Sequence, residues 1–522
     1  MATLTKVSDA DVLVSPSTGA KMTTDGTVRN GMPRPAKVWG RASGFLAAAG
    51  LVVLAGCDFL DPTGVENPRT TADDLAEAAE PVRALLPGLR VQFARAVGSV
   101  AVIAEVASDN YSVHGTGLST VWDDPRTVQP TDMNSTAGAT GIYWNLQELR
   151  ALADFVLNDI APGDETAGND LLAEVHYYRG MAYVMQGENF THVPTEANGA
   201  PRPSSELLQR GVSDLEQSLS LDGSAAFAVA ARAGLARAHR AAGNREAAMQ
   251  AANQALGQSG DFVFSRLYDA TFFTNPPHLF LVVRALKEMQ PLPRLDFLDP
   301  KYLTRESGIP VAKAEEMHLI LAEAALSTGN WQAARDHTAD AVALALSRGT
   351  SSFDEDDIRL NGDLSPRPRN SEIVIRADPD SPFRAGLVLD RPGVIQVPTV
   401  SGTSLDADSV RALATEDEAW HAFHLARQEI LFLEGRRLSD LGIRLPMMLR
   451  EIDQNPSIDQ GSPGTTVTVP SYIPPNDRMN RFDPASPYDG DDLDSPLSTT
   501  EVTILFDLNR ILAENRVTAF GG

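Results

Sequence analysis

The sequence predicts an all-α fold in which helical hairpins form a scaffold and long irregular insertions project from it. Three observations support this class. Apolar residues recur at helical spacing through much of residues 71–522. Alanine dominates the composition while aromatic residues make up 6%, a balance that suits closely packed helices. Three segments in the middle of the chain also repeat similar residues at equal offsets.

The repeat predicts paired antiparallel helices. Its copies are Gly180, Tyr183 and Gly187; Ala236, His239 and Gly243; and Ala322, Ala325 and Gly329. Small residues at these offsets let two helices approach closely, and the glycine supplies a permissive turn between them. The spacing resembles the tetratricopeptide repeat, with ordinary alanine-rich hairpins as the alternative. We expect hairpins near residues 173–220, 226–256, 313–346 and 416–441, within one helical domain over 71–522.

The rest of the domain alternates helices with insertions. Helices are expected at roughly 72–86, 87–108, 140–160, 168–187 and 203–220, and a single helix from about 416 to 440. Insertions without helical periodicity occupy 109–139, 257–312, 347–415 and 451–500. Long irregular insertions on a rigid scaffold are usual places for binding.

The N-terminal region carries an export signature around the sole cysteine. Basic residues precede an apolar run over 44–55, which at about a dozen residues is too short for a membrane span of roughly 20. Leu54-Ala55-Gly56-Cys57 closes this run and resembles a bacterial lipoprotein box, so Cys57 is the expected lipidation site. A buried core helix with an incidental cysteine is the alternative.

The same signature sets the expected boundaries of the mature chain. Residues 1–56 would be a signal peptide with an upstream extension, and Met32 is a candidate true start. Residues 57–70 would then be a lipid-anchored tether.

The net charge excludes several classes of partner. The chain carries −25 at neutral pH, and loss of residues 1–56, which hold six Lys/Arg and three Asp/Glu, leaves −28. Such acidity argues against nucleic acid as a partner and against adsorption to anionic lipid by protein charge. The expected attachment to the lipid bilayer is therefore through acylated Cys57.

A further signature lies towards the C-terminal end. It consists of Arg427, Glu429, Glu434, Gly435, Arg437, Asp440 and Leu441. These mixed charges could form a solvated helix face, but their order resembles the signature of SusD/RagB-family nutrient-uptake lipoproteins. Other family features follow in the right order, including the box at Cys57, a Trp-containing helix at 142–157, the hairpins, and Asn370-Ser371-Glu372-Ile373-Val374.

The resemblance implies a surface-exposed lipoprotein of the outer membrane that acts as a lid on a SusC-like TonB-dependent transporter. It would bind an oligosaccharide or a peptide and deliver it to the barrel, without catalysis and without a cofactor. In this family the repeats chiefly face the barrel, and the insertions build the ligand face. The Val/Leu-rich end at 501–522 departs from the family, because it lacks the usual Pro-rich ending.

Candidate ligand contacts follow from the chemistry of sugars. Flat aromatic faces and side chains that satisfy hydroxyls bind them. The insertion at 109–139 offers both, and Tyr111, His114 and Trp122 are the expected contacts, with structural packing as the alternative. The neighbouring Tyr143 and Trp144 are expected in the core of their helix.

Enzyme and metal motifs are scarce. The sequence contains no Gly-x-Ser-x-Gly, no His-Glu-x-x-His and no phosphate-binding glycine loop. His421 and His424 are expected to be a surface pair, since two ligands make an incomplete zinc site. Acidic runs at 354–357 and 489–494 could hold structural calcium but do not fit the EF-hand order, so solvated acidity is expected.

Two other functions stay open. The first is a scaffold lipoprotein of envelope assembly, whose repeats would bind protein segments. The second is a secreted glycoside hydrolase or lyase, because the spatial separation of two carboxylates, which identifies such an enzyme, cannot be read from sequence.

Overall fold

The computed structural model describes residues 79–113, 120–222, 225–283, 289–354, 372–389, 393–474, 480–483 and 501–521. Several sequence predictions lie outside these ranges: the signal peptide, Cys57 and the tether, His114, and nearly all of both acidic runs. Among the described helices, none combines the length and apolarity that crossing a bilayer requires.

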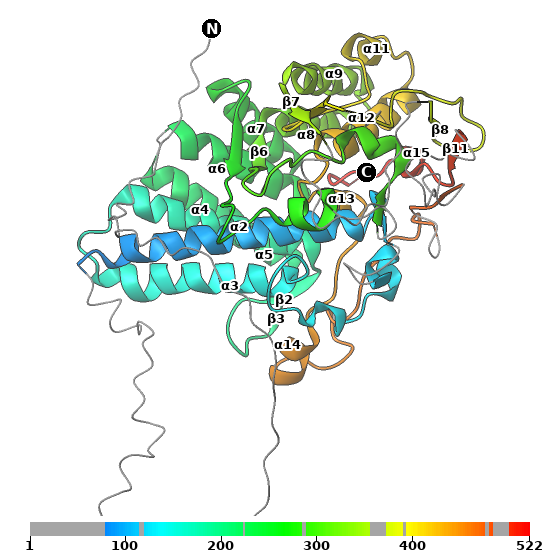
Figure 1. Cartoon of the computed structure of the whole chain (residues 1–522). Coiled ribbons are helices and arrows are strands. Elements are labelled where there is room, and N and C mark those ends of the chain that lie inside the picture. Colours follow the sequence, from blue (N-terminus) through cyan, green and yellow to red (C-terminus); the bar gives the residue numbers. More distant parts are fainter. Residues whose placement is uncertain are drawn as a thin grey trace, which may run out of the picture. The chain divides into compact units, whose positions relative to one another are not determined.

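Helical hairpins form the scaffold, which confirms the predicted fold class. Its helices are α4 (Asn169–Asn189), α5 (Ser204–Leu221), α6 (Ala225–Ala241), α7 (Arg245–Gln258), α8 (Ala314–Leu326), α9 (Trp331–Ser347) and α12 (Glu416–Ile430). Each packs against the next in this order (Figure 1), so the stack continues from α7 to α8 across the insertion between them.

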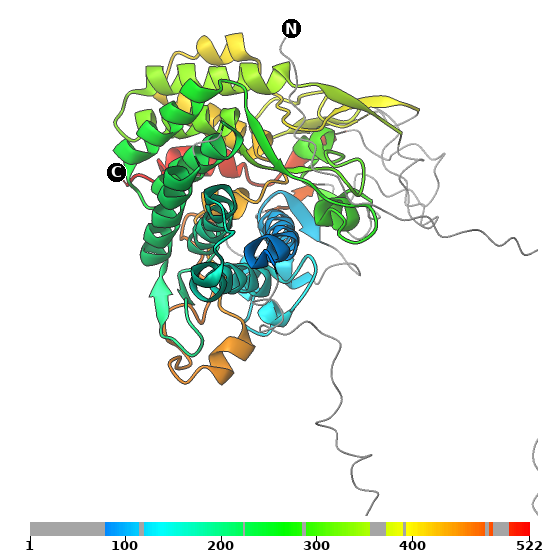
Figure 2. The same cartoon turned by 90° about the vertical axis from the view of Figure 1, so that its left-hand side faces the viewer.

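The first scaffold helix is covered by α2 (Pro81–Val106) and α3 (Ile142–Phe155), and Figure 2 views this group nearly end-on. The predicted helix break before Pro87 is wrong, because α2 runs through it. Pro87 is exposed, whereas Leu86 and Leu89 are buried. The proline ring therefore lies on the solvent side of α2. The burial of the continuous apolar stripe stabilises the helix by more than the hydrogen bond lost at Pro87 costs.

Glycines set how closely α4 and α5 approach. A Cβ on Gly180 would lie 3.1 Å from the carbonyl oxygen of Gly211. Gly187 lies inside α4, where a Cβ would lie 2.7 Å from Leu208 Cγ, so the turn predicted at this glycine is wrong. At Gly243 and Gly329 the predicted turn is confirmed, with φ of +76° and +74°.

Short strand pairs organise the connections between helices. The strands are β1 (Tyr111–Val113), β2 (His192–Pro194), β3 (Pro201–Pro203), β4 (Val263–Arg266), β5 (Met289–Pro291), β6 (Ile309–Lys313), β7 (Thr350–Phe353), β8 (Val374–Arg376), β9 (Ile395–Pro398), β10 (Phe482–Asp483) and β11 (Glu501–Ile504). Antiparallel pairs join β1 to β5, β2 to β3, β4 to β6 and β7 to β9. A fifth sheet has the order β10–β11–β8, in which β11 is parallel to β8.

Short helices complete the described structure. They are α11 (Ala407–Arg411), α13 (Arg437–Asp440), α14 (Leu449–Gln454) and α15 (Leu508–Glu514). In α15, Leu508 and Leu512 are fully buried. The Val/Leu-rich C-terminal segment therefore packs into the core.

The helix predicted over 416–440 is two helices. α12 ends at Ile430, and α13 begins only at Arg437. Between them Leu433 and Gly435 have φ of +60° and +76°, in the left-handed region that favours glycine. The single-helix prediction is wrong because the chain turns at these residues.

The charges of the 427–441 string are buried, so the alternative of a solvated helix face does not hold. Arg427 donates two hydrogen bonds to Asp440, at 3.0 and 2.9 Å. Glu434 Oε1 accepts from Lys301 Nζ at 2.6 Å and from Lys313 Nζ at 2.5 Å. Burial alone would raise the pKa of Asp440, but the Arg427 and Arg240 charges hold it well below its usual value.

The same buried network joins distant parts of the chain. Arg437 Nε and Nη2 donate to the two carboxylate oxygens of Asp109 at 2.6 and 2.7 Å, and its Nη1 donates to Asn509 Oδ1 at 3.0 Å. Gln428 Nε2 donates to Asp109 Oδ2 at 2.9 Å. Loss of one partner would leave a charge buried without compensation, which is costly.

Candidate functional site

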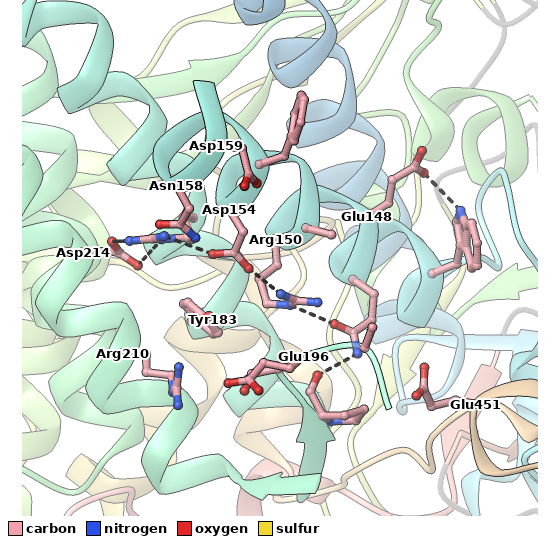
Figure 3. A pocket seen from close by; sticks show the side chains of 18 of the residues that line it. Glu148, Arg150, Asp154, Asn158, Asp159, Tyr183, Glu196, Arg210, Asp214 and Glu451 are labelled. Carbon is pink, nitrogen blue, oxygen red and sulfur yellow. Dashed lines mark hydrogen bonds and ion pairs between the residues drawn. The ribbon is translucent and has the colours of Figure 1, made fainter. Parts of the chain in front are cut away.

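A polar pocket of about 830 Å³ opens among the first helices of the scaffold (Figure 3). The pocket is lined by side chains from α3, α4 and α5. Residues 194–197, at the end of β2, line it as well. Glu451 of α14 also contributes. The site is thus built mainly on rigid helices.

The α3 side of the pocket is a helical stripe. Lining residues from α3 and the turn after it include Trp144, Gln147, Glu148, Ala151, Asp154, Phe155 and Asn158. Their spacing of three and four places them on one face. The opposite face buries Leu146, Leu149 and Ala153 in the core, and this burial fixes the orientation of the polar face.

Four charged side chains form a continuous chain of ion pairs along the pocket (Figure 3). Asp154 accepts from Arg150 Nη1 at 2.5 Å and from Arg179 Nη1 at 3.0 Å. Arg179 also donates two hydrogen bonds to Asp214, at 2.9 and 2.7 Å. These bonds link α3, α4 and α5, and they hold the polar groups in fixed positions.

Two further contacts position neighbouring groups. Gln147 Oε1 accepts from Arg150 Nε at 3.1 Å, and Gln147 Nε2 donates to the carbonyl of Pro194 at 3.0 Å. Burial and the Asp154 charge raise the pKa of Tyr183, so its hydroxyl stays protonated at neutral pH. Burial would lower the pKa of Arg179, but Asp214 and Asp154 raise it above its ordinary value.

Carboxylates outnumber guanidiniums in the pocket lining. The acids are Glu148, Asp154, Asp159, Glu196, Asp214 and Glu451, and the arginines are Arg150, Arg179 and Arg210. Because the ion-pair chain neutralises two of the acids, the others leave the pocket with a negative field. Trp144 is partly exposed beside them, and its Nε1 donates to Glu148 Oε2 at 3.1 Å.

The described members of the predicted ligand set lie elsewhere. Tyr111 is 0% exposed, its hydroxyl donates to Asp299 Oδ1 at 2.8 Å, and its ring stacks on Phe432. Trp122 is 2% exposed, and neither residue lines the pocket. Buried rings offer no face to a sugar, so both pack the core in this conformation. Ligand binding by Tyr111, His114 and Trp122 stays a prediction.

Two other sequence expectations are resolved by burial. Tyr143 is buried as expected, whereas Trp144 lines the pocket. The predicted surface pair is wrong for His424, which is 4% exposed, because its helix turns that side to the core. His421 Nε2 lies 2.9 Å from Asp507 Oδ2.

Sequence reasoning missed the ion-pair chain. Arg150 and Asp154 are four residues apart on α3, but Arg179 and Asp214 come from α4 and α5, so no local motif connects all four. One signal was present: Trp144, Gln147, Glu148 and Ala151 share a helix face, and a tryptophan at the end of a polar stripe marks a surface.

Fold and pocket together define a helical-hairpin protein with an acidic, solvent-open pocket. No family model matches the chain, and no curated protein matches it.

Solved structures similar to this chain are SusD superfamily proteins. One from Bacteroides fragilis is 14% identical with a TM-score of 0.47, and the match covers 73% of this chain and 98% of that one. One from Bacteroides thetaiotaomicron is 12% identical with a TM-score of 0.45, over 72% and 98%. A SusD-like carbohydrate-binding protein from Bacteroides vulgatus is 12% identical with a TM-score of 0.42, over 69% and 82%.

Proposed function

We propose that this protein binds an oligosaccharide in the pocket among α3, α4 and α5, without catalysing a reaction. In the full proposal it is anchored to the outer membrane through acylated Cys57, and it acts as the lid and delivery subunit of a SusC-type TonB-dependent transporter.

The binding proposal depends on one observation. The partly exposed ring of Trp144 lies in the pocket beside carboxylates and guanidiniums that can hydrogen-bond to a ligand. An aromatic face packs against the C–H patches of a sugar ring, while carboxylates and guanidiniums satisfy its hydroxyls. The ion-pair chain from Arg150 to Asp214 holds these groups before the ligand arrives, which reduces the entropy cost of binding.

The charge of the pocket narrows the ligand class. The carboxylates of Glu148, Asp159 and Glu196 line it, are exposed and lie outside the ion-pair chain. They would repel uronic acids and sulfated sugars, so the proposed ligand is a neutral or amino-sugar oligosaccharide. A basic peptide is the second ligand class that this field would accept.

Replacing Trp144 with alanine should weaken oligosaccharide binding about tenfold or more, equivalent to about 1.4 kcal/mol, because the stacking face is lost. The measurement is isothermal titration calorimetry against a panel of neutral, amino-sugar and acidic oligosaccharides. Thermal melting would establish that the variant folds.

Trp331→Ala is the matched control, since Trp331 lies on α9, stacks with Arg335 and does not line the pocket. It should keep wild-type affinity. Equal affinity of the Trp144→Ala variant and wild type, or a preference for acidic glycans, would contradict the proposed site. A loss of affinity confined to a folded Trp122→Ala variant would instead favour the insertion at 109–139.

The partner is tested by mild-detergent pull-down from the native membrane, followed by mass spectrometry. We expect a stoichiometric TonB-dependent barrel, and a Cys57→Ala variant should leave the membrane fraction. Recovery of an envelope-assembly complex without a barrel would support the scaffold alternative and overturn the transport role.

A further inference from the structure

The α8–α9 hairpin carries a group of metal-ligating side chains outside the pocket. His318 on α8 and His337 and Asp340 on α9 each offer one ligand atom, and these three atoms lie within 4.8 Å of one another. His337 and Asp340 are three residues apart, so they share a face of α9. The tight packing of α8 on α9 brings His318 to that face.

Both imidazoles have a nitrogen that makes no hydrogen bond. Among the described residues, the buried Nδ1 atoms of His318 and His337 have no partner, and the two ring centroids are 6.1 Å apart. A buried polar atom without a protein partner costs free energy unless a water, a ligand or an ion satisfies it.

We propose that His318, His337 and Asp340 bind one divalent transition-metal ion of the Zn²⁺ class. Two imidazoles and one carboxylate are a recognised three-ligand set for Zn²⁺, and they leave a fourth tetrahedral position for water or for a partner's side chain. Calcium fits poorly, because it takes six to eight oxygen ligands, whereas this site offers two nitrogens.

The neighbouring arginine competes with the ion. Asp340 Oδ1 accepts from Arg411 Nη2 at 2.9 Å, and the two side chains are 45% and 43% exposed. A metal ion bound to the Asp340 carboxylate would share that carboxylate with the Arg411 guanidinium, and the two positive charges would repel each other. Since Arg411 ends α11, metal binding should loosen the contact between α11 and α9.

The experiment is a Zn²⁺ titration of the full chain, without a polyhistidine tag and after chelator treatment, followed by calorimetry. We expect one ion per chain. His318→Ala and His337→Ala should each weaken binding at least tenfold, while Arg411→Ala should tighten it. Co²⁺ in place of Zn²⁺ should give the strong visible absorption of a tetrahedral site in the wild type, and His318→Ala and His337→Ala should lose it.

His239→Ala is the matched control, because His239 on α6 is also partly buried with an unpartnered Nδ1 but belongs to no such group in the described part of the chain. It should bind Zn²⁺ like wild type. Absence of stoichiometric binding, or histidine variants that bind as wild type does, would overturn the proposal. Should those variants fail to fold, Asp340→Asn decides: Zn²⁺ should raise the Tm of wild type and raise that of Asp340→Asn much less.

Discussion

Arg437→Met should lower the free energy of unfolding by about 3–5 kcal/mol, the cost of breaking a buried ion pair from one side. The arginine makes a two-bond ion pair with Asp109 and also bonds Asn509. Both charged groups are almost completely buried. Methionine fills similar space but leaves the Asp109 carboxylate with one hydrogen bond from Gln428 and a longer, 3.9 Å contact with Arg294 Nη2. Urea unfolding followed by circular dichroism measures the change.

The matched control is Arg83→Met, which removes an exposed ion pair with Glu80 on the first turn of α2. Its effect should stay below about 1 kcal/mol, because exposed pairs contribute little. Adding Asp109→Asn to Arg437→Met should recover part of the loss, since the orphan charge is removed. Similar small effects from Arg437→Met and Arg83→Met would mean that burial does not set the strength of this pair.

Glu105→Gln should abolish a decline in stability between pH 4.5 and about 8. Burial raises the pKa of Glu105 to about 8, against 4.5 for the exposed side chain. Between these values the folded state retains a proton that the unfolded state has lost, so stability falls as pH rises, by at most about 1.4 kcal/mol per pH unit. Stability curves of wild type and Glu105→Gln across this range give the difference.

The two proteins should be similar near pH 4.5, and the glutamine variant should be the more stable one near pH 8. Burial lowers the pKa of His424 and His278, so these histidines also titrate in this window, but both proteins contain them and their contributions cancel in the difference. The difference curve therefore reports Glu105 together with Lys301, whose charge acts on it. Parallel curves across the window would show that this carboxyl is already ionised in the folded protein.

The hairpin scaffold was predictable because its signals are local. Small residues at fixed offsets and glycine turns such as Gly243 and Gly329 specify helix pairs without reference to the rest of the chain. Gly187 shows the limit of this reasoning. Gly187 occupies the same repeat position, but it lies inside α4 and allows close contact with Leu208 of α5. Only the packing of α5 shows that this glycine serves a helix contact and not a turn.

The buried charges could not be predicted in the same way. A helix that alternates Arg and Glu usually has a solvated face. The ion-pair partners of Arg437 and Glu434, Asp109 and Lys301, are more than 100 positions away in the sequence. The pocket has the same difficulty, because its ion-pair chain assembles from three helices. An aromatic cluster in an irregular insertion was a stronger signal in sequence, yet Tyr111 and Trp122 are packed inside.

The bond between Arg437 and Asp109 spans 328 positions, and the one between Asn480 and Tyr111 spans 369. The ribosome synthesises Asp109 and Tyr111 long before Arg437 and Asn480. The residues that follow α2 therefore lack their partners until most of the chain has been made. Contacts of this range also form slowly. The newly made protein therefore passes through a long period with its future centre exposed, and its yield in the cell depends on how well that unfinished chain is protected from aggregation.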